Sequence, residues 1–168
     1  GFVLLFEGGV RVGDELEIDG NLVKVKGIAL RATRVETVEG DLVVIPNSKI
    51  AGNSVLNFSQ GLTSTRINVS VGVAYGSDVE LVRQLLLDAI TAQPQIVKSP
   101  SPQVIFSEFG DSALNFEVRG WVHSPWNRII IKSDIRFRID TLFRTNKIKI
   151  PFPQRELYIT NTAPSDPS

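Results

Sequence analysis

Short runs in which apolar and polar residues alternate one by one fill the first third of this 168-residue chain. Leu16 and Ile18 alternate with glutamates. Val23 and Val25 alternate with lysines. Because successive side chains of a strand point to opposite faces, alternation at period two predicts β-strands with one buried face. The pair Asp19-Gly20 between two such runs favours a tight hairpin, so the pattern predicts short antiparallel strands.

One run breaks the alternation. Residues 42–45 are apolar without interruption, which is typical of a strand covered on both faces. Pro46-Asn47 ends it, since Pro has no amide to donate and Asn tolerates turns. A helical turn at 48–51 and a strand at 54–59 complete about five strands. We therefore expect a small Sm-like (SH3-like) β-barrel over residues 13–60.

The pattern changes beyond residue 60, and residues 61–162 predict a second domain. A long alternating strand at 67–75 comes first. A helix with one apolar side follows, for which we expect a capping box with Ser77 as N-cap and Glu80 as its partner. Pro94 ends this helix.

Two further strands are predicted at 103–109 and 113–122. Ser124-Pro125 predicts the start of a second helix, which we expect to run to about Thr145. Residues 156–160 predict a final strand. The order strand–helix–strand–strand–helix–strand is the ferredoxin-like arrangement, so the fold class is α+β and mostly β. Both helices then cover one face of the sheet, and the open face carries polar residues that include Ser70, Asn115, Glu117 and Arg119.

The second helix has apolar residues on two sides. Ile131 and Ile135 belong to one stripe. At about 100° per residue, Trp126, Ile130 and Phe137 fall nearly opposite. A helix that covers one sheet needs a single stripe, so the second stripe predicts contact with another subunit. The alternative is that Trp126 and Ile130 pack under a neighbouring loop.

Composition gives no argument for an enzyme. The chain has no Cys and a single His, which removes thiolate metal sites, disulfides and Cys nucleophiles. His123 has no orienting partner near it in the sequence, and we expect a surface role. An acidic cluster lacks the spacing of a calcium loop; it comprises Asp14, Glu15, Glu17 and Asp19. We expect no enzymatic activity, no metal site and no cofactor.

Four groups of residues resemble the small-conductance mechanosensitive channel family, in the family's order and over nearly the whole chain. They are 43–47 with 50–53, 71–78, 109–116 and 150–154. The resemblance implies part of a membrane channel on the cytoplasmic side of the inner membrane. There, a ring of subunits, usually seven, forms a hollow vestibule with side openings. The resemblance assigns no catalytic residues.

The resemblance also gives roles to both ends of the chain. Residues 1–12 would be the end of a pore-lining helix and its junction, although a short core strand or buried helix is the alternative for so short an apolar run. The pore-helix residues would be Phe2, Leu4, Leu5 and Phe6. The last strand would join an intersubunit barrel through Glu156, Leu157, Tyr158 and Ile159. Residues 163–168 are expected to be a disordered tail.

The expected partners follow from this assignment. They are other copies of the chain, the membrane through helices upstream of residue 1, and the ions and small osmolytes that pass under membrane tension. The formal net charge is zero, which predicts weak ion selectivity. The alternative is a soluble module that binds RNA or a small ligand. Zero charge and a single aromatic on the open face, Trp121, argue against nucleic acid.

Overall fold

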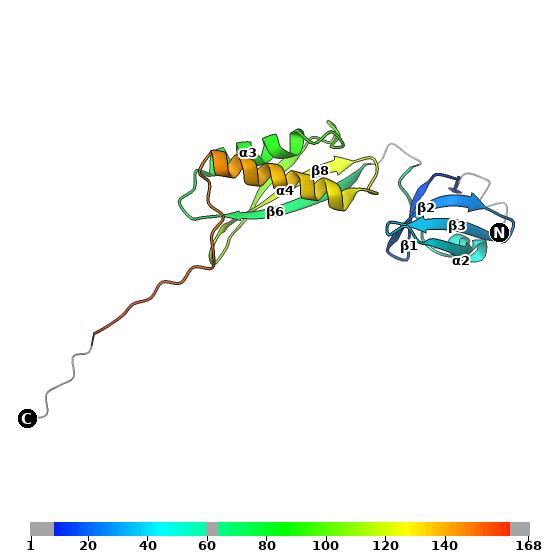
Figure 1. Ribbon diagram of the computed structural model, residues 1–168, viewed down its shortest axis with the longest axis horizontal. Coiled ribbons are helices and arrows are strands. Elements are labelled where there is room, and N and C mark those ends of the chain that lie inside the picture. Colours follow the sequence, from blue (N-terminus) through cyan, green and yellow to red (C-terminus); the bar gives the residue numbers. More distant parts are fainter. Residues whose placement is uncertain (1–8, 60–63, 162–168) are drawn as a thin grey trace, which may run out of the picture.

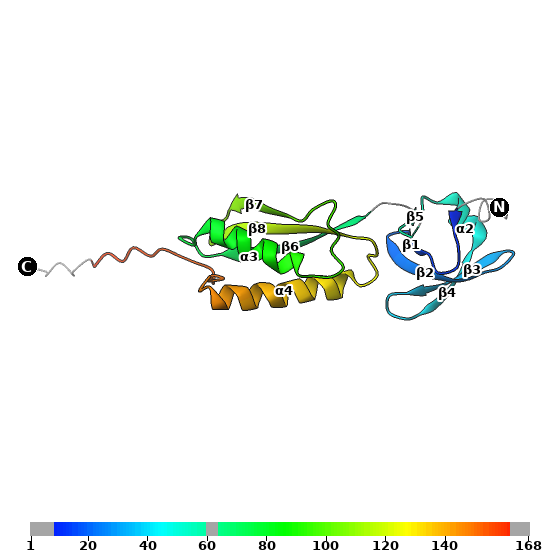
Figure 2. The ribbon, with the colours of Figure 1, turned by 90° about the horizontal axis from the view of Figure 1, so that it is seen from above.

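The computed structural model describes residues 9–59 and 64–161 and contains two antiparallel sheets in separate parts of the chain (Figure 1). We call the N-terminal part the β domain and the second part the α/β domain. Two helices lie on one side of the second sheet (Figure 2). The expected α+β, mostly β fold class is confirmed.

The β domain is a five-stranded sheet with the order β4-β3-β2-β1-β5. The predicted hairpin turn is present, because Asp19 and Gly20 both have positive φ, 51° and 78°. Leu16 and Val25 are fully buried, and Ile50 of the short helix α2 packs with them. The expected closed barrel is not shown: among the described residues β4 and β5 are the two ends of the sheet and do not pair with each other, so the sheet is open. The strands are β1 Glu15–Ile18, β2 Asn21–Ile28, β3 Ala32–Thr37, β4 Leu42–Pro46 and β5 Leu56–Asn57, and α2 is Asn47–Gly52.

The prediction that residues 42–45 are covered on both faces is wrong for the single chain. Leu42 is 62% exposed and Val44 is 61% exposed. Only Ile45 of this run packs against the core. The physical reason is position: β4 is an end strand that pairs with β3 alone, and nothing among the described residues covers its outer surface. The strand predicted at 54–59 is also shorter than expected, because only the two residues of β5, Leu56 and Asn57, pair with β1.

The α/β domain has a three-stranded sheet with the order β6-β8-β7. The central strand alternates strictly, with Leu114, Phe116 and Val118 buried and the residues between them half-buried. Both helices pack on the buried face, where the core includes Leu86 and Ile135. The predicted open face is therefore confirmed. The elements are β6 Thr65–Val73, α3 Val79–Thr91, β7 Gln103–Phe109, β8 Leu114–Val122 and α4 Arg128–Thr145.

The N-cap of helix α3 is one residue later than predicted. Asp78 is the N-cap, and its carboxylate accepts hydrogen bonds from the backbone amides of Glu80 and Leu81, at 3.1 and 3.2 Å. The Ser77 hydroxyl instead donates to the Ala74 carbonyl, 2.6 Å away. A carboxylate caps well because it also complements the positive end of the helix dipole.

Helix α4 begins later than predicted as well. Its N-cap is Asn127, three residues after Ser124, so Trp126 precedes the helix. The Ser124 hydroxyl donates to the Glu15 carboxylate rather than capping α4. The stripe argument therefore does not apply to Trp126, whereas Ile130 and Phe137 do lie on α4.

The predicted final strand at 156–160 is wrong for the single chain, because the residues after 150 are extended and pair with no strand of the described chain. A strand needs a neighbour to complete its hydrogen bonds. Near this segment the Ala74 amide donates to the Lys149 carbonyl, at 2.8 Å. The Gln154 amide donates to the Ser112 hydroxyl, at 3.1 Å. The chain then leaves the α/β domain (Figure 1).

Some predictions fall outside the described residues. They concern the tail at 163–168 and the proposed pore-helix residues Phe2, Leu4, Leu5 and Phe6.

Candidate functional site

Three exposed apolar surfaces stand out in the described chain. The first is β4, described above. The second is the outer face of α4, where Phe137 is 72% exposed and Ile129 and Ile130 are also exposed. Beside Phe137, between α3 and α4, lies a hollow of about 430 Å³ that includes Ala89 and Leu142 in its lining. The outer face of α4 thus offers apolar surface that the fold of a single chain leaves uncovered.

The third surface is the C-terminal segment, residues 150–161. Leu157, Tyr158 and Ile159 are each about four-fifths or more exposed, and Phe152 is equally open. Glu156 lies among them and is exposed too. Consecutive large apolar side chains in water are unfavourable by roughly 1.5–3 kcal/mol each relative to full burial. This segment is therefore suited to pairing with other chains.

Trp126 lines the same groove as Ile129 and Ile130 but is not itself exposed. Its ring is half-buried and has Lys24 Nζ 4.4 Å from its centre, a cation–π contact with the β domain. Within the described chain Trp126 thus contacts strand β2 of the β domain, not a neighbouring loop. Ile130 instead remains 61% exposed at the rim of a groove between the two domains.

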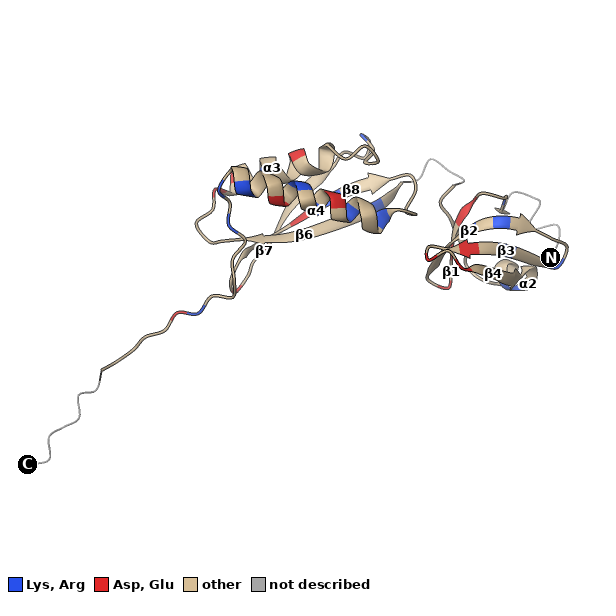
Figure 3. Cartoon of the chain, in the orientation of Figure 1, with Lys and Arg blue, Asp and Glu red and all other residues tan. Residues whose placement is uncertain are grey.

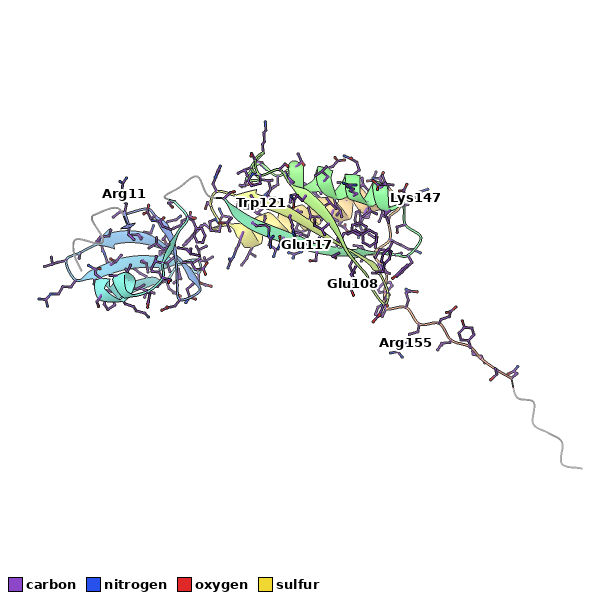
Figure 4. All side chains as sticks on the ribbon, turned by 180° about the vertical axis from the view of Figure 1, so that it is seen from behind. Arg11, Glu108, Glu117, Trp121, Lys147 and Arg155 are labelled. Atoms are coloured by element: carbon purple, nitrogen blue, oxygen red, sulfur yellow. The ribbon has the colours of Figure 1, made fainter. Side chains whose placement is uncertain are left out.

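The open sheet face carries the predicted polar residues. Ser70 lies opposite Glu117 in the β6–β8 pairing, and Asn115 lies opposite Gly72. Arg119 donates to Glu117 from Nη2 and Nε, at 2.9 and 3.2 Å. Glu117 and Trp121 lie four residues apart on β8 and so belong to the same face (Figure 4). The face is thus polar, with its central charges paired.

Charge of both signs is spread over both domains (Figure 3). His123 is exposed in the connection between β8 and α4. Asp14 is buried, and its carboxylate accepts from the Arg11 amide and from Asn57 Nδ2, each at 2.8 Å, so this acid ties the β domain together. Within residues 9–59 and 64–161, no group of three or more His, Cys, Asp or Glu side chains is placed to hold a metal ion.

Models of two protein families match this pair of domains. The β-domain model of mechanosensitive ion channels matches residues 1–60. The model for the C-terminal region of the mechanosensitive ion channel MscS matches residues 67–150. The chain belongs to the MscS family.

Curated members of the MscS family are similar along most of the chain. The mechanosensitive channel MscK of Escherichia coli is 38% identical over 161 residues, which is 96% of this chain. The small-conductance mechanosensitive channel of Helicobacter pylori is 32% identical over 161 residues. The chain spans 14% of MscK and 58% of the Helicobacter protein. These relatives are channels rather than enzymes.

Two solved structures are similar to this chain in fold. The closed-state crystal structure of Helicobacter pylori MscS has a TM-score of 0.79 and 31% identity, and the match covers 95% of this chain and 63% of that one. A cryo-EM structure of Arabidopsis thaliana MSL1 has a TM-score of 0.67 at 12% identity, which shows the fold alone; the match covers 89% of this chain and 56% of that one. In the described part of this MscS-family chain, no helix is both long and apolar enough to cross a membrane.

Sequence reasoning missed two groups of residues. The contacts Glu15–Ser124 and Lys24–Trp126 join the two domains, and no sequence signal indicates them because their partners are about a hundred residues apart. The exposed outer surface of β4 was also missed. Its signal was present, because a continuous apolar strand at the end of a sheet needs a cover from elsewhere.

Proposed function

We propose that this chain is the vestibule-forming region of a mechanosensitive channel subunit on the cytoplasmic side of the inner membrane. Copies of it, seven as the family resemblance implies, form a ring and a hollow chamber. Ions and small osmolytes pass through the chamber when membrane tension opens the pore, which protects the cell from osmotic shock. Membrane attachment is through helices upstream of residue 1.

The C-terminal segment is the observation that carries this proposal. Residues 156–159 are extended, exposed and largely apolar, and they have an unused row of backbone donors and acceptors. Such a segment is stable in water only when its edges and side chains are covered. Equivalent segments from neighbouring copies, placed around an axis, pair into a closed barrel that covers all of them.

The β domain supports assembly independently. Strand β4 has a free edge and an exposed apolar surface in the described chain, with Val43 also 40% exposed. A neighbouring copy that lies against β4 removes this surface from water and completes the sheet edge. The exposed Ile130 and Phe137 of α4 give the α/β domain a third surface for contact between copies.

The open sheet face supports the passage of ions. Its central charges, Glu117 and Arg119, neutralise each other, and Ser70 and Asn115 are uncharged. A chamber lined in this way remains wetted without a strong field of one sign, so it admits both cations and anions.

The experiment uses the full-length protein in an Escherichia coli strain that lacks its own mechanosensitive channels. We expect expression to restore survival after a sudden drop in osmolarity. We also expect excised membrane patches to conduct when suction is applied. A full-length protein that reaches the membrane but gives neither survival nor tension-activated current contradicts the proposal.

A further inference from the structure

The described residues of the two domains meet through side chains at one corner of the β domain. Ser124 Oγ lies 2.8 and 2.7 Å from the two carboxylate oxygens of Glu15. Lys24 Nζ lies 4.4 Å from the centre of the Trp126 ring. Each pair joins β1 or β2 to the connection between β8 and α4. These two pairs supply a hydrogen bond and a cation–π contact between the domains.

The two pairs form a single unit. Glu15 and Lys24 are direct partners in the β1–β2 pairing, so their side chains are neighbours on one face of the sheet. On the other side, Ser124 Oγ accepts a hydrogen bond from the Trp126 backbone amide, at 3.4 Å. The hydroxyl that donates to Glu15 thus also helps to hold Trp126 over Lys24. We call these four residues the latch.

The described residues on either side of the connection between the domains lie at the same corner. The backbone of Glu15 accepts from the Phe58 amide and donates to Ser59 Oγ, each at 2.9 Å, just before the chain leaves the β domain. In the α/β domain, Thr65 at the start of β6 pairs with Val122, two residues before Ser124. Two bodies attached at one point can rotate about it, and the latch then determines the angle between them.

A groove of about 350 Å³ lies beside the latch, with residues of both domains in its lining. Rotation of one domain relative to the other changes the width of this groove. Its lining comes from two turns of the β domain, at 20–22 and 37–39, and from residues 126–130. Of the latch residues only Trp126 lines this groove. The hydrogen bond between Ser124 and Glu15 is exposed, so water weakens it. From this geometry we propose that the β and α/β domains are joined as a hinge, which the latch holds closed and which opens without unfolding either domain.

The test measures the distance between the domains within one subunit of the full-length protein. Spin labels are placed on Ser48→Cys and Arg136→Cys, two exposed positions in different domains. Cysteines elsewhere in the full-length protein are replaced, and doubly labelled subunits are diluted with unlabelled ones. We expect one narrow distance distribution. Ser124→Ala or Lys24→Ala should increase the share of a second, longer component by roughly two- to fivefold, as expected for a single exposed contact.

Matched controls separate the latch from a general effect of substitution. Glu17→Ala and Lys26→Ala remove the same charges two residues along the same strands, and Lys26 pairs with Glu36 inside the β domain. Both controls should keep the narrow distribution. Latch variants that match wild type, or controls that broaden it equally, overturn the hinge. The readout needs no channel activity, so it is independent of the proposed function.

Discussion

At the residue scale, one buried amide holds the connection between β2, β3 and α2 in place. Asn47 accepts from Thr33 Oγ1 at 2.8 Å and donates to the carbonyls of Ala29 and Leu30, at 3.0 and 3.2 Å. The side chains of Asn47 and Thr33 are both buried. The residue that the sequence marks as the end of a strand is thus also a hydrogen-bonding centre.

Asn47→Ala should lower the free energy of unfolding of the β domain by about 1–3 kcal/mol, because a buried hydroxyl and two carbonyls lose their partner. Urea unfolding of the chain, followed by circular dichroism, measures the change. Asn53→Ala, at an exposed position six residues away, is the control and should change stability by less than about 0.5 kcal/mol. Equal effects of the two substitutions would show that the Asn47 hydrogen bonds add nothing.

Glu117→Gln tests whether the open sheet face lines the ion path. The change leaves Arg119 without its anionic partner and removes one negative charge per subunit, so the net charge of each subunit rises by one. We expect the full-length channel to become more permeable to anions, seen as a shift in reversal potential across a KCl gradient. Glu80→Gln makes the same change of charge on α3, on the covered side of the sheet, and should shift it less. A larger shift from Glu80→Gln argues against the assignment.

At the element scale, α4 has two apolar sides, of which one is buried against the sheet and the other is exposed. Ile135 is fully buried against the sheet, whereas Phe137, two residues along the same helix, is 72% exposed. Periodicity locates both sides in the sequence, but it does not say which neighbour covers the second one. In the described chain nothing covers it.

The double substitution Ile130→Asp with Phe137→Asp should dissociate the oligomer while leaving the fold intact, because both side chains lie at the surface of the single chain. Light scattering coupled to size exclusion, on the full-length protein in detergent, measures the mass. Ile135→Ala is the contrasting change, and it should cost about 2–5 kcal/mol of stability through the cavity it leaves. An unchanged oligomeric mass in the double variant excludes this face as a subunit contact.

At the scale of the whole molecule, the chain is two small folded domains with uncovered edges. The free edge of β4 and the extended C-terminal segment each have backbone groups and apolar side chains in water. Assembly is the simplest way to cover both, and the proposed barrel of C-terminal segments connects copies at a point away from the β domains.

Deletion of residues 155–168 should therefore weaken the assembly of the full-length channel, seen as a lower mass in detergent and a shorter lifetime of the oligomer. Deletion of 162–168 alone keeps Leu157, Tyr158 and Ile159 and serves as the control, with an unchanged mass expected. If the longer deletion also leaves the oligomer intact, then the C-terminal segment contributes no intersubunit pairing, and the assembly is held by other surfaces.

The sequence by itself determined the features that depend on local periodicity. Alternation located β1, β2 and β6, the pair Asp19-Gly20 marked the hairpin turn, and the spacing of apolar residues found the buried side of α4. These succeed because the period of a strand or helix is a property of neighbouring residues. The same reasoning identified the polar open face, since it is the other half of the alternation in β8.

Only the tertiary structure decided which hydrogen-bond partner a side chain uses and whether a strand is covered. Ser77 and Ser124 both looked like helix caps, but the hydroxyl of Ser77 is used by a carbonyl and that of Ser124 by Glu15. The run at 42–45 has a buried strand's composition, yet its place at the end of the sheet leaves it exposed. A hydrogen bond or a cover supplied from a hundred residues away leaves no local pattern, because only folding brings the partners together.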